Sequence, residues 1–419
     1  MRKSVNALAL NLALILTFLL PTLASADALE TVQIHGFVSQ GYLVSDNNDF
    51  LANTKAGSLE FNEIGLNFVM EPVQKLRIGI QLFSRDLGAV DKDRVDLDWA
   101  FADYHWRDEL GVRVGRCKTP MGLFHDAIDL DMTRTTIFLP LVVYDIRVRN
   151  SFMGVNGIQV YGNIPMKFLG NLDYVAFFGT NTANPDSLKV EYSALMDLEE
   201  VSIKDMYGGR LIWNTPLNGL LFGGSYLTAV NFEARGKITP QLTAPIAMLG
   251  GLSIYPAGTE AIHKSKEIIV WYGFTQYTRQ KLSITGEFYR LHMNGNLATS
   301  QPFDPFVGAL IGFNGLPSSI VNRAGWYAQV NYQFLSWLTA ATTYGEAYND
   351  WNDREGHNYS PSWTAFQKDT TLSLRFDINA HWNVKLETHF MDGAGLLMAG
   401  EEIDTRRWNL YAIKTSVYF

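Results

Sequence analysis

The chain has 419 residues with 34 basic and 42 acidic side chains, so its formal net charge is −8. This acidic balance argues against a nucleic-acid partner, and a single cysteine, Cys117, excludes an internal disulfide. A mean hydropathy near zero, 13% aromatic residues and 35 glycines are compatible with many alternating strands.

The N-terminus has the composition of a secretory signal peptide. Arg2 and Lys3 precede an apolar core at 7–20, and the small residues Ala24-Ser25-Ala26 follow. The apolar run is short for a membrane anchor helix, which is the alternative. We therefore predict a signal peptide at 1–26 and one barrel domain at 27–419. Removal of the leader takes two positive charges, so the mature 393 residues carry −8 − 2 = −10.

Apolar residues recur at every second position in segment after segment. Between Arg323 and Phe334, Ala324, Trp326, Ala328 and the following even-numbered residues are mostly apolar, whereas the odd-numbered residues are mostly polar. This period indicates β-strands with one apolar face. About sixteen strands of this kind are expected, at 31–44, 59–70, 75–83, 95–106, 110–115, 154–164, 172–180, 206–214, 220–230, 267–278, 282–293, 325–334, 338–347, 370–378, 382–391 and 408–419.

The connections between these expected strands alternate strictly between short and long. Seven short and eight long connections predict an even-numbered membrane barrel with both termini on the same, periplasmic side. A soluble sandwich gives no reason for such alternation. The long connections are expected at 45–58, 84–94, 116–153, 181–205, 231–266, 294–324, 348–369 and 392–407.

The apolar faces fit contact with lipid, because a charge at the bilayer midplane costs about 2–4 kcal/mol. The last strand ends in Phe419, with Val417, Thr415, Ile413 and Tyr411 on its face, and it resembles the terminal strand that the barrel-assembly machinery reads in bacterial outer-membrane proteins. Aromatic residues at strand ends are expected to form interfacial girdles: Trp99, Phe101, Tyr174, Phe178, Trp326, Trp382 and Tyr411.

Strand parity assigns the charged residues to the lumen. The expected pore wall carries five bases and six acids, so neither sign dominates. The bases are Arg77, Arg113, Arg210, Arg375 and Lys385, and the acids are Glu63, Asp96, Asp98, Glu287, Asp377 and Glu387.

The third long connection is the longest and is rich in charge. A loop of this length between paired strands is usually functional, and we expect it to fold into the barrel and narrow a water-filled pore. Its acids Asp126, Asp129 and Asp131 are expected to face Arg77 and Arg113 across the constriction; a cap on the outer surface is the alternative. The expected constriction residues are Lys118, His125, Asp126, Asp129, Asp131, Arg134, Asp145, Arg147 and Arg149.

No motif for catalysis or for a cofactor is found, neither a nucleophile elbow nor a phosphate-binding glycine loop nor a zinc-binding pattern. We expect no enzyme, no cofactor and no resident metal. Acids in the first long connection, at 46–49, leave open a calcium site.

Gly115-Arg116-Cys117-Lys118-Thr119-Pro120-Met121-Gly122 resembles a Gly-Arg-x-x-x-Pro-x-Gly pattern that leads into the third loop of the phosphate-selective porin O/P superfamily and related proteobacterial porins. The resemblance covers about the first 165 residues and the terminal strand. It implies a sixteen-stranded barrel, a homotrimer and a third loop folded inside. The acidic mature chain and the balanced wall charges do not fit the arginine and lysine clusters of phosphate-selective members.

Together these patterns predict an all-β transmembrane barrel in the outer membrane of a Gram-negative bacterium. The expected function is passive diffusion of small polar or charged solutes, with outer-membrane lipid, lipopolysaccharide and the assembly machinery as partners. A closed or plugged barrel, acting as a structural sheath or adhesin, is the alternative.

Overall fold

A computed structural model describes residues 32–51, 53–88, 90–149, 154–181, 185–188, 192, 195–244, 253–311, 319–397 and 403–419. The expected signal peptide at 1–26 lies outside the described residues.

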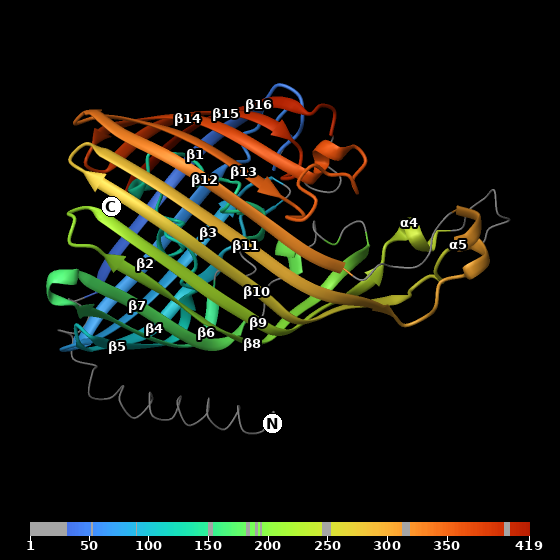
Figure 1. Cartoon of the computed structure of the whole chain (residues 1–419), viewed down its shortest axis with the longest axis horizontal. Helices are drawn as coiled ribbons and strands as arrows, with labels where there is room; N and C mark the ends of the chain where they lie inside the picture. The colour runs from blue at the N-terminus through green and yellow to red at the C-terminus, as the bar shows by residue number, and fades with distance from the viewer. Residues whose placement is uncertain are drawn as a thin grey trace.

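Sixteen antiparallel strands form one closed barrel, in which every strand pairs with its neighbours in the chain and the last pairs with the first (Figure 1). The sequence prediction of fold class is confirmed. The strands are β1 (Gln33–Ser45), β2 (Asn62–Val73), β3 (Leu76–Asp86), β4 (Asp96–Arg107), β5 (Leu110–Lys118), β6 (Gly154–Pro165), β7 (Asn171–Asn181), β8 (Met196–Asn214), β9 (Leu220–Ile238), β10 (Glu260–Arg279), β11 (Leu282–Thr299), β12 (Ser319–Leu335), β13 (Leu338–Tyr348), β14 (Phe366–Asn379), β15 (Trp382–Gly393) and β16 (Arg407–Tyr418).

Short helices occur only between strands in the described ranges, and none of them is long and apolar enough to cross a membrane. The helices are η3 (His125–Ala127), η4 (Asp131–Thr133), η5 (Ile146–Val148), η6 (Lys167–Leu169), η7 (Pro185–Leu188), α4 (Pro240–Thr243), α5 (Pro305–Ile311) and η9 (Ser362–Ala365).

Closure of the barrel joins the first strand to the last. Tyr42 of β1 lies opposite Ile413 of β16. Phe419 and Gly36 exchange backbone hydrogen bonds of 3.0 and 3.1 Å. Short and long connections alternate around the barrel as predicted. One end of the barrel therefore has tight turns and the other has the long loops.

The two faces of the strands differ in chemistry. On β14 and β15, Leu374 and Leu386 are exposed on the outside, whereas Ser373, Lys385 and Glu387 on the inside are buried. An apolar outer surface around a polar interior is the arrangement of a transmembrane barrel. The outward aromatic residues Trp271, Tyr226 and Tyr207 lie on neighbouring strands, as an interfacial girdle requires.

Two residues expected in the girdle face inward instead. Trp99 stacks on Phe101 with ring centroids 5.1 Å apart, and the guanidinium of Arg113 lies 4.5 Å from the Phe101 ring centroid. A register irregularity in β4 opposite Gln81 and Leu82 inserts one residue, which reverses the parity that the sequence indicated.

Five consecutive strands, β8 to β12, are longer than the sequence predicted, and β8 to β11 project beyond the barrel toward α4 and α5 (Figure 1). Lys264 of β10 pairs with Glu233 of β9 at 3.1 Å on the exposed face of this projection. Lys264 lies seven residues past the girdle residue Trp271, which is about 20 Å of strand. Because lipid disfavours such charges, the projection lies outside the apolar band.

An arginine introduced on the outer face should destabilise the barrel more than an arginine introduced on the inner face. We expect Leu374→Arg to destabilise the bilayer-inserted barrel by about 2–4 kcal/mol, because Leu374 faces lipid. Gln333→Arg on the inner side of β12 is the control and should cost less than about 1 kcal/mol. Denaturant unfolding in lipid vesicles measures both, and equal effects would contradict this assignment of the faces.

Candidate functional site

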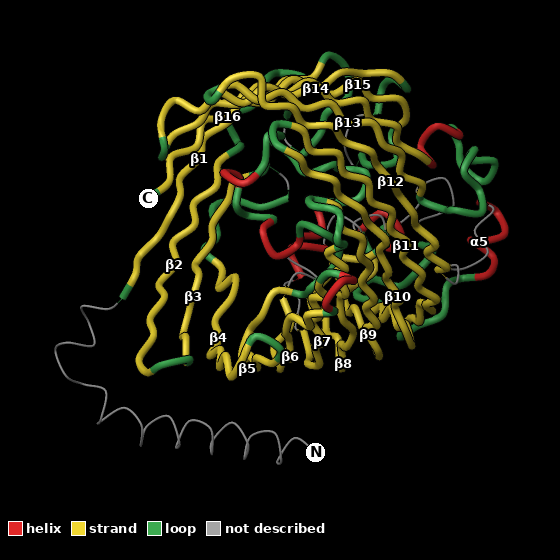
Figure 2. The backbone as a smooth tube through the Cα atoms, turned by 60° about the vertical axis from the view of Figure 1, so that its left-hand side comes forward, coloured by secondary structure: helices red, strands yellow, loops and turns green. Residues whose placement is uncertain are grey.

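The loop between β5 and β6 lies against the inward-facing residues of distant strands, and helical segments are visible within the ring of strands (Figure 2). It begins with a tight turn at Gly122, whose φ is +57°. A Cβ atom at this position would collide with the Glu287 carboxylate, so the turn requires glycine. This is the final glycine of the pattern noted in the sequence.

Glu287 of β11 binds the start of the loop. Its carboxylate accepts hydrogen bonds from the backbone N–H of Leu123 at 2.9 Å, the hydroxyl of Tyr144 at 2.6 Å and the hydroxyl of Tyr327 at 3.2 Å. Leu123 and Tyr144 belong to opposite ends of the loop. The buried wall residue Glu287 thus holds two segments of the loop beside each other.

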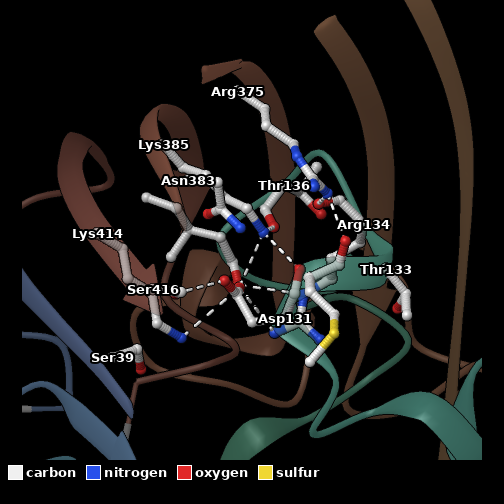
Figure 3. Close-up of polar contacts among 12 residues, drawn as sticks. Ser39, Asp131, Thr133, Arg134, Thr136, Arg375, Asn383, Lys385, Lys414 and Ser416 are labelled. Atoms are coloured by element: carbon white, nitrogen blue, oxygen red, sulfur yellow. Dashed lines mark hydrogen bonds and ion pairs between the residues drawn. The ribbon is translucent and has the colours of Figure 1, made fainter. Parts of the chain in front are cut away.

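Asp131 is the most extensively paired acid of the loop (Figure 3). Lys385 Nζ lies 2.9 Å from its Oδ1, Ser416 donates a 2.7 Å hydrogen bond to its Oδ2, and Lys414 Nζ lies 3.7 Å from its Oδ1. Burial alone would raise the pKa of Asp131, but Lys385 and Lys414 outweigh burial and lower it. The carboxylate is therefore ionised and fixes the loop to β15 and β16.

Lys385 also donates to two carbonyl groups of the loop, those of Asp131 at 2.7 Å and Thr136 at 3.2 Å. Arg375 of β14 donates to the carbonyls of Met132 and Arg134, at 2.5 and 3.1 Å. These contacts fix the loop backbone as well as its side chains.

Glu387 of β15 accepts hydrogen bonds from two consecutive backbone N–H groups of the loop. Its oxygens accept from Ile137 at 2.7 Å and from Phe138 at 3.0 Å. Behind it, His389 lies 3.0 Å from Glu387 and 2.9 Å from Asp369. A histidine between two carboxylates, all buried, holds Glu387 in place.

A four-residue cluster closes the loop against β4 and β5. Lys118 pairs with Asp98 at 3.2 Å and with Asp129. Arg149 pairs with Asp98 at 3.3 Å and also with Asp129. Two cations therefore compensate two buried acids.

The expected field across the constriction is not formed by the residues named from the sequence. Asp126 pairs with Arg210 of β8, whereas Arg77 and Arg113 both pair with Asp103 of β4, at 3.0 and 3.2 Å. The expectation that loop acids face Arg77 and Arg113 was therefore wrong. Pairing with nearer partners neutralises the acids.

The remaining expected residues form local pairs. Arg134 donates to the Ile128 carbonyl at 2.7 Å, Arg147 pairs with Asp145 at 2.6 Å, and Arg94 pairs with Asp96 at 2.6 Å. The pairs of Asp377 with Arg375 and of Glu63 with Lys414 also lie on the inner wall.

The acids of the first long connection accept hydrogen bonds from nearby backbone and side-chain groups. The carboxylate of Asp46 accepts hydrogen bonds from Asn409 N and Nδ2, and Asp49 accepts one from Lys55 N. Among the described residues, no group of three or more His, Cys, Asp or Glu side chains is placed to hold a metal ion.

Sequence reasoning missed several inner-wall residues that matter. Lys414, Asp103, Arg85 and Asp369 face inward, and each pairs with another charge or a histidine. Parity could have identified Lys414, because it alternates with Ile413 and Thr415 in the terminal strand. Asp103 follows the strand irregularity, so parity alone could not place it.

The geometry defines a class: a sixteen-stranded transmembrane barrel with a charged loop anchored to its inner wall. Scans against models of known families find no match, and no curated relative is found. Solved structures do share the fold.

The outer membrane channel DcaP of Acinetobacter baumannii is 10% identical with a TM-score of 0.53. OmpF of Salmonella typhi is 11% identical with a TM-score of 0.57, and OmpT of Vibrio cholerae is 10% identical with a TM-score of 0.52. Each alignment covers 93% of this chain and 97% of the other chain. At these identities the likeness establishes the fold.

Removal of Asp131 should loosen the loop. Asp131→Leu leaves the buried cation Lys385 without its carboxylate. We therefore expect the free energy of opening of the loop to fall by about 3–5 kcal/mol. The double variant Asp131→Leu/Lys385→Met should recover part of this loss. Protection factors from hydrogen exchange at loop amides measure it. Asp404→Leu, which removes the exposed pair with Lys55, is the control and should change stability by less than about 1 kcal/mol.

His125 gives the loop a pH dependence. Burial, opposed by Asp126 and the Met121 backbone and aided by Arg210 and Lys118, lowers the pKa of His125 from 6.5 to about 4. Between these values the unfolded chain binds a proton that the folded loop does not, so stability falls as pH drops from 6.5 toward 4. Amide protection factors around His125 should decrease more over this range in the wild type than in His125→Phe. An equal pH dependence of the two proteins would contradict this assignment.

Proposed function

We propose that the protein is an outer-membrane porin that admits small polar or charged solutes by passive diffusion. One observation carries the proposal: charged side chains on the inner face of the barrel are exposed to water. The side chain of Arg77 is 44% exposed and that of Asp126 is 52% exposed, although both face inward. Solvent therefore reaches both of these charged side chains.

The anchored loop supports a role as the constriction. Its contacts with Glu287 of β11 and with Lys385 and Glu387 of β15 attach it to strands far around the barrel from β5 and β6, which supports a loop that crosses the interior. A fixed loop limits the size of solutes by its position, and the exposed charges along the path decide the ion preference.

The finer features of the proposal rest on resemblance. The Gly115–Gly122 pattern supports kinship with the phosphate-selective porin O/P superfamily and related porins, but the pairing of Arg77 and Arg113 with Asp103 favours a general solute channel over a phosphate channel. Export through the leader at 1–26, recognition of Phe419 by the assembly machinery and contact with lipopolysaccharide belong to the same proposal. A homotrimer is supported by the likeness to the trimer form of Vibrio cholerae OmpT, whose TM-score is 0.50.

Conductance in planar bilayers tests the channel. The purified protein should give stable steps of ion current. If repeated recordings show no such steps, the closed sheath or adhesin is favoured. Asp126→Asn removes an exposed carboxylate beside Arg210, so the reversal potential in asymmetric salt should shift toward anions. Asp197→Asn, on the exposed face of the β8 projection, is the control and should leave the reversal potential unchanged. Equal reversal potentials in all three proteins would place Asp126 off the ion path.

A further inference from the structure

A cavity of about 90 Å³ separates the start and end of the loop from the wall formed by β9 to β12. Met121, His125 and Tyr144 line it from the loop, and residues of the four strands line it from the wall. The cavity is partly open. The hydrogen bonds and ion pairs that anchor the loop do not fill this cavity.

Most of the cavity wall on β9 to β11 is apolar. Leu227, Ile268, Val270 and Leu291 contribute aliphatic side chains from three neighbouring strands. The interior of a water-filled barrel is ordinarily polar. An apolar concave surface inside such a channel favours solutes that can remove it from water.

Aromatic rings complete the lining. The ring centroids of His125 and Tyr144 are 5.2 Å apart, those of His125 and Tyr272 are 5.8 Å apart, and those of Tyr272 and Tyr289 are 5.6 Å apart. Rings at these separations pack edge to face or stack with further rings. The lining therefore suits a flat aromatic molecule better than a branched or fully hydrated one.

His125 adds one polar preference. Its ring is buried and its Nδ1 has no hydrogen-bond partner in the described part of the chain. Burial lowers its pKa to about 4, so the ring is neutral, and the Met121 backbone accepts a hydrogen bond from it. A neutral imidazole carries one proton, so Nδ1 is an acceptor in the tautomer that carries its proton on Nε2, and the proposal concerns this tautomer. A ligand that donates a hydrogen bond would satisfy it.

The charges at the edge of the cavity compensate one another. Asp145 pairs with Arg147 and also interacts with Arg323, while Arg149 pairs with Asp98. A solute with its own full charge would compete with these pairs. The site therefore favours a neutral solute.

The volume limits the solute to one ring. An apolar protein cavity of about 150 Å³ holds benzene. The space here is about 90 Å³ and partly open, so one ring fits with part of its edge toward the lumen.

We propose that this cavity is a binding site for neutral, one-ring aromatic solutes that carry a hydrogen-bond donor, with phenol as the simplest example. Binding at this site deepens the proposed channel function, because a solute held here lies beside the anchored loop. Transport of such solutes rests on the channel function, whereas their binding does not.

Isothermal titration calorimetry of the purified full-length barrel in detergent tests the site with two probes. Phenol has the donor, and anisole, its methyl ether, has the same ring without it. We expect phenol to bind about tenfold more tightly than anisole, the effect of one net hydrogen bond to a buried acceptor. Equal affinities would overturn the role of the donor.

Three variants assign the signal to the cavity. His125→Phe keeps a ring but removes the acceptor, so the affinity for phenol should fall to that for anisole. Val270→Phe fills the cavity and should abolish binding of both probes. Val330→Phe makes the same change on the outward face of β12 and is the control for detergent partitioning and folding. Unchanged phenol binding in Val270→Phe, or a retained preference for phenol in His125→Phe, would overturn the proposal.

Planar-bilayer conductance of the same preparations separates this proposal from the channel function. Phenol binding without ion steps supports the binding site and contradicts the channel function. Ion steps with no phenol binding by the wild type support the channel and overturn the site.

Discussion

An acid inside the barrel and away from water must be compensated, and this constraint determines how the loop folds. Asp98, Asp129, Asp131, Glu287 and Glu387 are each at most 9% exposed. An unpaired charge at such a position costs several kcal/mol, so each acid is surrounded by cations or by hydrogen-bond donors. The wall acids take donors from the loop, and the loop acids take cations from the wall. The loop is thus held to the wall by charges and hydrogen-bond donors that the two surfaces supply to each other.

The same pairing decides which charges a solute would meet. Most of the loop and wall charges are used in contacts between loop and wall, and they contribute little net field along the lumen. Some paired charges nevertheless remain exposed, among them Arg77 and Asp126. Ion preference therefore depends on a small number of exposed side chains and not on the balance of all charges along the wall.

The sequence predicted the barrel well, because the bilayer imposes a period of two on every spanning strand and an even number of strands on the whole. It underestimated β8 to β12, because their outer ends carry charge on the exposed face, as at Glu233 and Lys264, and resemble loops when only lipid-facing strands are sought. It failed for the pairing of Asp131 with Lys385, because 254 residues separate these partners and no local pattern connects them. Nor could periodicity place Trp99 and Phe101, since one inserted residue reverses a strand's faces.

The position of the cavity follows from the same principle that anchors the loop. Where the wall offers charged or hydrogen-bonding groups, at Glu287, Lys385 and Glu387, the loop is drawn into direct contact. Where β9 to β11 offer Leu227, Ile268 and Leu291, the wall side chains themselves are apolar and form no hydrogen bond with the loop. A backbone already fixed by its polar contacts on either side cannot move to fill that gap. The loop therefore leaves His125 Nδ1 without a partner beside an apolar wall, and a space remains that only a solute with both a ring and a donor would fill well.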